Sequence, residues 1–82
     1  MSRYSLDPRT GRDYNVTVGW DAPLETFFGQ VIAPDGELLV DVGDPFDRVL
    51  NPGQVLDEVR PYAPIPVGLD TELIRDAVDD AA

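Results

Sequence analysis

The amino-acid sequence predicts a small domain of the α+β class, in which a three-stranded antiparallel β-meander is followed by two short helices packed on one face. Three features lead to this prediction. Apolar and polar residues alternate early in the chain, a proline–glycine turn joins two β-forming runs, and capping signals open two helical runs near the end. The chain has 82 residues, which is enough for one domain with a thin core.

Three runs of β-forming residues account for the predicted meander. Strict alternation of apolar and polar residues over 13–20 predicts the first strand, because successive side chains of a strand point to opposite faces. Residues 25–32 are rich in aromatic and β-branched types and predict the second strand. A tight turn at 33–36 returns the chain into a third strand at 37–42. Strands that follow each other in sequence pair most often, so 25–32 is expected to be central.

The N-terminal segment is expected to lie outside this sheet. Residues 1–12 contain turn signals at Asp7-Pro8 and Thr10-Gly11, and they predict a flexible N-terminal arm. Residues 13–82 then form a single β-β-β-α-α domain.

The first helix has clear local signals at both ends. Asn51 can cap its N-terminus, and Pro52 suits the first helical position. Leu50 and Val55 have the spacing of a hydrophobic staple, and Pro61 stops the helix after about two turns.

The second helix is predicted to start at Asp70, after a proline-rich linker at 62–67. Its apolar residues share one face: Leu73, Ile74, Ala77, Val78 and Ala81. Asp79 and Asp80 oppose the helix dipole near the C-terminus, so this end is expected to fray.

Two adjacent aromatic residues in the second strand raise the question of what covers the sheet. Phe27 and Phe28 must point to opposite faces, and two short helices can cover only one of them. The N-terminal arm or residues 43–50 could cover the other face, or a β-bulge at Gly29 could reset the alternation. Alternatively, the second face is an exposed apolar patch that binds a partner or mediates dimerisation.

The composition argues against catalysis. Histidine, cysteine and lysine are all absent, which removes the usual bases and nucleophiles, and no phosphate-binding loop or cofactor motif is present. Asp41, Asp44 and Asp47 recur every three residues, a spacing that raises a calcium site as an alternative. They lack the order of a calcium loop, so a solvated turn is the preferred interpretation and no metal ligands are assigned.

The formal net charge of −10 disfavours direct binding to nucleic acid and favours basic protein surfaces. The same acidity could instead reflect only solubility or a biased composition. No apolar run is long enough to cross a membrane and no secretory signal is visible, so a cytoplasmic location is expected.

The run Val18-Gly19-Trp20-Asp21-Ala22-Pro23-Leu24-Glu25-Thr26-Phe27-Phe28 resembles the V-G-W-D-x-P-L-x-T-F-F core of small bacterial proteins that have no established activity. Those proteins continue with a hairpin and a helical tail that contains proline. The resemblance implies no activity and no functional residues. In size, acidity and missing catalytic residue types the chain is also similar to phage- or plasmid-encoded inhibitors such as anti-CRISPR proteins.

These observations together predict a non-enzymatic, acidic protein-binding module. Its most specific form is an inhibitor that blocks a basic nucleic-acid-binding surface of a host or defence protein. The residues predicted to bind the partner are apolar or acidic: Phe27, Phe28, Ile32, Asp35, Glu37, Asp41, Asp44, Asp47, Asp76 and Asp79. The alternatives are a self-associating accessory protein and a module stabilised by Ca²⁺.

Overall fold

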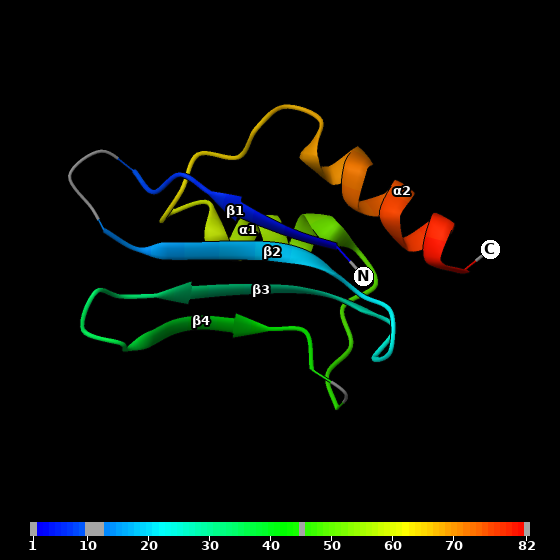
Figure 1. Ribbon diagram of the computed structural model, residues 1–82, viewed down its shortest axis with the longest axis horizontal. Coiled ribbons are helices and arrows are strands. Elements are labelled where there is room, and N and C mark those ends of the chain that lie inside the picture. Colours follow the sequence, from blue (N-terminus) through cyan, green and yellow to red (C-terminus); the bar gives the residue numbers. More distant parts are fainter. Residues whose placement is uncertain (1, 10–12, 45, 82) are drawn as a thin grey trace.

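The computed structural model describes residues 2–9, 13–44 and 46–81. The elements are strands β1 (Ser2–Leu6), β2 (Asn15–Asp21), β3 (Thr26–Ile32) and β4 (Leu38–Val42), followed by helices α1 (Pro52–Val59) and α2 (Leu69–Ala81). The strands form one antiparallel sheet in the order β1-β2-β3-β4 (Figure 1). The α+β class, the antiparallel sheet and the two helices are therefore confirmed. No helix in the described ranges combines the length and apolar character needed to cross a membrane.

The sheet has four strands, not the three that were predicted. Residues 2–6, expected to belong to a flexible arm, form β1 and pair along β2 from Ser2 opposite Trp20 to Leu6 opposite Val16. Their alternation places Tyr4 and Leu6 against the core. Residues 10–12 of the predicted arm lie outside the described residues.

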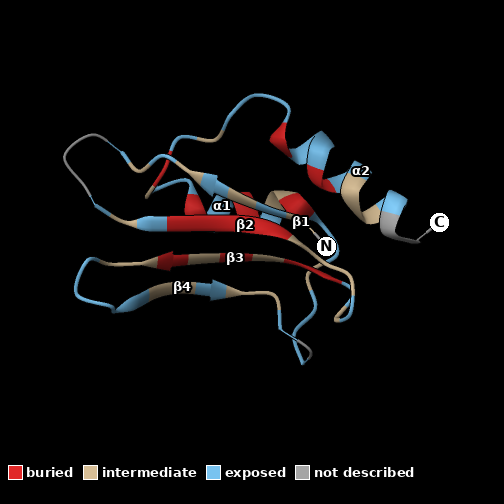
Figure 2. Ribbon diagram, in the orientation of Figure 1, coloured by how far each residue is buried: buried red, intermediate tan, exposed pale blue. Residues whose placement is uncertain are grey.

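The two faces of the sheet are in different environments. Residues directly opposite each other on paired strands share a face, so Tyr4, Val18 and Gly29 lie on one side. Both helices pack on this side, with α1 behind the sheet in Figure 1. We call the other side the open face. Figure 2 shows that buried residues run along the two central strands, β2 and β3.

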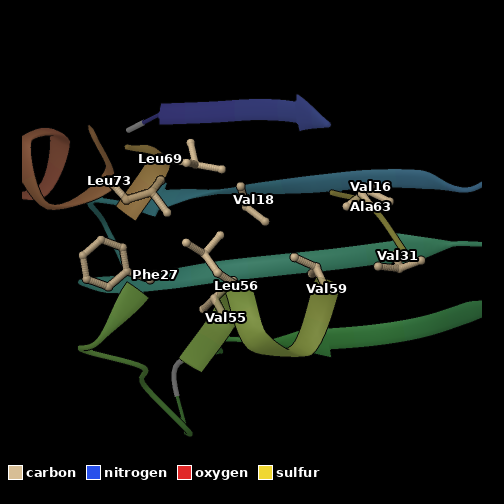
Figure 3. Close-up of a cluster of buried hydrophobic side chains, with 10 residues drawn as sticks. All are labelled: Val16, Val18, Phe27, Val31, Val55, Leu56, Val59, Ala63, Leu69 and Leu73. Carbon is tan, nitrogen blue, oxygen red and sulfur yellow. The ribbon is translucent and has the colours of Figure 1, made fainter. Parts of the chain in front are cut away.

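The core lies between the sheet and the helices. Figure 3 shows side chains from α1 and α2 meeting those of β2 and β3. The buried apolar residues of this cluster are Val16, Val18, Phe27, Val31, Val55, Leu56, Val59, Ala63, Leu69 and Leu73.

The bulge that was considered at Gly29 lies elsewhere. Gly29 keeps regular pairing with Val18 and Val42, and α1 approaches it so closely that a Cβ there would lie 2.6 Å from a Val55 methyl group. The register instead shifts between Val31 and Ile32, which pair with Val40 and Leu38. Leu39 is therefore the extra residue of a β-bulge, and the apolar residues Leu38, Leu39 and Val40 follow one another without an intervening polar residue.

The predicted start of α1 is confirmed. Asn51 is the N-cap in an extended conformation, its side-chain oxygen accepts a hydrogen bond from the Gly53 amide at 2.9 Å, and Pro52 is the first helical residue. The helix ends at Val59, just before Pro61. In α2, Leu69 and Leu73 are buried on the side that faces the sheet.

Candidate partner-binding surfaces

The structure separates the two phenylalanines as predicted, and it removes one of them from the accessible surface. Phe27 is only 4% exposed and packs in the core against Trp20, with ring centroids 4.9 Å apart. Phe27 therefore packs mainly in the core. Phe28 and Ile32 are half-buried on the open face.

Phe28 is partly covered by its own chain. The Arg3 guanidinium lies 5.9 Å from the centre of the Phe28 ring, and the ring lies over Gly19, where a Cβ would come within 2.8 Å of it. Thus the N-terminal segment contributes to the open face through a residue of β1. The rest of this face is mostly polar, as is usual for the solvated side of an antiparallel sheet.

A shallow depression of about 330 Å³ brings several predicted residues together on the open face. Phe28 lies in it with carboxylates from Asp21, Asp41 and Asp44. These carboxylates are positioned by their neighbours. Asp21 accepts a hydrogen bond from the Leu24 amide at 3.3 Å, and Asp41 accepts one from the Gln30 side chain at 3.5 Å.

Two acids of the β3–β4 turn and the following loop support local backbone, whereas Glu37 and Asp47 are exposed. Asp35 accepts from the Glu37 amide at 2.9 Å. Asp44 accepts from the amides of Phe46 at 2.9 Å and Asp47 at 2.7 Å, which is the solvated turn expected for this segment. Over the residues that the structure describes, no three acidic side chains converge as metal ligands would.

The two predicted acids of α2 lie on the helix side and cannot join the open-face depression. Asp79 is exposed, whereas Asp76 is half-buried and accepts a hydrogen bond of 2.5 Å from the Tyr4 hydroxyl. This hydrogen bond, partial burial and the negative charges of Asp76 and Glu72 raise the pKa of Tyr4 to about 12. Asp76 therefore connects α2 to β1.

A larger apolar surface lies where α2 passes the start of α1, and sequence reasoning did not assign it. This groove of about 970 Å³ is formed by Trp20, Phe27, Leu50, Pro52, Ile74 and Val78, and we call it the helix groove. Leu50 is 72% exposed, Val78 62% and Ile74 49%. Leu50 therefore does not pack as the predicted staple. The Glu25–Arg48 ion pair, 3.3 Å long, lies at the same groove.

Hydrogen bonds fix the wall of the helix groove that carries Arg48 and Leu50. The Thr26 hydroxyl, fully buried, accepts from the Val49 amide at 2.7 Å and donates to the Phe27 carbonyl at 2.8 Å. The Phe27 amide in turn donates to the Val49 carbonyl at 2.9 Å. The residues on either side of Val49 are thereby held against the start of β3.

Trp20 forms part of the groove wall and has one polar atom without a partner. Its indole Nε1 is buried and makes no hydrogen bond with any described residue. Trp20 is also the only tryptophan of the chain, which makes its fluorescence specific for the groove.

The sequence contained part of the signal for the helix groove. The apolar face predicted for the second helix included Ile74 and Val78 together with Leu73. In the structure Leu73 faces the core, while Ile74 and Val78 extend the apolar stripe beyond what the sheet covers.

Comparison of the chain with protein-family models, curated proteins and solved structures gave no match.

Proposed function

We propose that this chain is a non-enzymatic, acidic module that binds another protein with a basic surface. The observation that carries the proposal is the helix groove, in which the three apolar side chains Leu50, Ile74 and Val78 are open to solvent. Contiguous apolar surface of this kind on a small soluble domain commonly marks a binding site.

The charge distribution supports a basic partner. The chain carries 16 acidic residues and 6 arginines. Among the described residues, three of those arginines pair with acids, Arg48 with Glu25, Arg60 with Asp57 and Arg75 with Glu72. The excess of negative charge therefore remains available to attract a positively charged protein and to accelerate its association.

In its most specific form, the proposal makes the chain an inhibitor that occupies a basic nucleic-acid-binding surface of a host or defence protein. Asp21, Asp41 and Asp44 around Phe28 present carboxylates to the open face. Guanidinium groups that hold phosphates bind carboxylates through the same paired hydrogen bonds. The addition of the chain should then release nucleic acid from the purified partner in a competition assay.

A differential capture experiment tests the protein-binding function. The immobilised wild-type chain is compared with an Ile74→Gln/Val78→Gln double variant, which keeps the net charge but makes the helix groove polar. Val67→Gln is the matched control, because Val67 is 106% exposed and lies outside the groove. We expect a protein that the wild type and the control retain and the double variant loses.

The affinity for that protein, once purified, should fall about tenfold or more, roughly 1.4 kcal/mol, in the double variant. It should also fall steeply between low and moderate ionic strength. Capture that is equal for all three chains, or binding that is insensitive to salt and to the groove substitutions, would contradict the proposal. Light scattering on the free chain tests self-association in parallel.

A further inference from the structure

We propose that the helix groove docks an amphipathic helix of the partner, with apolar side chains in the groove and basic side chains beside the C-terminal end of α2. This inference rests on the protein-binding function above and names the conformation and chemistry of the bound segment. Three features of the groove lead to it: its backbone environment, the ridge on α2 and the surrounding charge.

The backbone around the helix groove offers no sheet edge to a partner. The strands that reach it, β2 and β3, are the two central strands and pair with each other. At the groove the Phe27 amide donates to the Val49 carbonyl and the Phe27 carbonyl accepts from the Thr26 hydroxyl, so both backbone groups already have partners. An extended peptide in this groove would leave its own backbone groups without partners on the apolar walls, which is costly. A helix satisfies its backbone internally and avoids this cost.

The shape of the α2 wall also favours a helix. Ile74 and Val78 are four residues apart, so they form a ridge along one side of α2. Such i, i+4 ridges pack into the grooves of a second helix, and Leu50 and Pro52 form the opposite wall. The occupant would lie beside α2 and cover the apolar side chains that the sheet leaves exposed.

The docked helix could come from a second copy of this chain or from another protein, and the charge around the groove favours another, basic protein. The last turn of α2 contains no basic residue, carries the exposed Asp79 and ends at the negative pole of the helix dipole. Glu25 at the rim is paired with Arg48, so these two residues add no net charge to the groove. A second copy of this chain would bring a further net charge of −10 to this surface, whereas a basic helix is attracted to it.

A designed peptide serves as the probe. It contains only leucine and lysine, with the leucines three and four residues apart so that they share one helix face. Its control is a scrambled peptide of identical composition, in which the leucines share no face. Both peptides carry the same positive charge, so any difference between them reports the amphipathic helix and not electrostatic attraction alone.

Binding of the designed peptide should shift the emission of Trp20, which lies in the groove wall, and should increase the helical circular dichroism beyond the sum of the separate components. We expect at least a tenfold lower affinity for the scrambled peptide and for the Ile74→Gln/Val78→Gln variant. The Val67→Gln variant should bind the designed peptide as the wild type does.

Equal affinity for both peptides, or unchanged affinity in the groove variant, would overturn the inference. A wild-type dimer that the groove variant abolishes would also overturn it, because a second copy would then be the occupant. If the probe fails while the captured partner still depends on Ile74 and Val78, helix docking is wrong and the protein-binding function stands. The designed peptide could bind in the groove as a helix while no protein is captured by the wild type and lost by the double variant. That outcome would support helix docking and contradict the protein-binding function.

Discussion

At the scale of single residues, the hydroxyl of Thr26 joins two parts of the chain that are far apart in sequence. It accepts from the Val49 amide and donates to the Phe27 carbonyl, and the side chain is fully buried. A buried polar group of this kind stabilises only when all of its partners are present. Thr26 therefore determines where Leu50 lies, and with it one wall of the helix groove.

Thr26→Val should destabilise the fold by about 2 kcal/mol, because the substitution keeps the shape of the side chain but leaves the partly buried Val49 amide without its acceptor. Thr26→Ser is the matched control, since it keeps the hydroxyl and should lose only about 1 kcal/mol for one buried methyl group. Urea denaturation measures both losses. Hydrogen exchange at the Val49 amide should be fast only in the valine variant, and equal protection in both variants would refute this role.

Two glycines show a second constraint that acts at single positions. A Cβ at Gly19 would lie 2.1 Å from the Ser2 carbonyl, and one at Gly43 would lie 2.0 Å from the Phe27 carbonyl. Gly43 also has a φ of +88°, which non-glycine residues rarely adopt. Close backbone contact at Gly19 is what allows β1 to pair along β2.

At the scale of elements, patterns among neighbouring residues correctly predicted a strand, a turn and the start of a helix. The alternation over residues 13–20, the turn at 33–36 and the Asn51-Pro52 start of a helix all correspond to observed elements. The short strand β1 was missed because five residues beside an Asp-Pro turn resemble a loop. Residues 2–6 form a strand because they pair with β2, and the sequence of these five residues alone does not show this pairing.

The contact between β1 and α2 is likewise not encoded locally. The hydrogen bond from Tyr4 to Asp76 joins residues at opposite ends of the chain. It attaches the edge strand to the helix that forms one wall of the groove. The same hydrogen bond, partial burial and nearby carboxylates raise the pKa of Tyr4 from 10.0 to about 12.

This shift predicts a loss of stability at high pH. The folded state holds the Tyr4 proton more tightly than the unfolded state, so the stabilisation is complete below pH 10 and disappears as the pH rises through about 12. Tyr4→Phe should lower stability at neutral pH by about 1.5–3 kcal/mol, the value of one hydrogen bond to a charged group. Denaturation at several pH values checks this, and an equally steep alkaline loss in Tyr4→Phe would assign the effect to other groups.

At the scale of the whole molecule, the helix groove arises from how the elements are arranged. The sequence defined an apolar face on the second helix, but the part of that face left uncovered depends on where α2 crosses the sheet. In the same way, the acids that were grouped as one binding surface are divided between the open face and the helix side. Asp41 and Asp44 lie together, whereas Asp79 lies on the opposite side of the sheet.

The net charge of −10 is a property of the whole molecule, and it should make stability increase with salt. The molecule measures 40 × 28 × 17 Å, so at low ionic strength, where the Debye length is about 30 Å at 0.01 M, carboxylates across the molecule repel one another. At about 0.15 M the length falls to about 8 Å and this repulsion is largely screened. The three exposed ion pairs among the described residues would also weaken, but each is worth only about 0–1 kcal/mol.

Repulsion should therefore dominate, and the melting temperature should rise as sodium chloride is added over this range. An uncharged osmolyte such as sucrose at matched osmolality is the control, because it favours the compact state without screening charge. A melting temperature that falls with salt would show that attractive pairs outweigh repulsion. The acidic surface would then be internally compensated, and it would have little charge left to attract a basic helix to the groove.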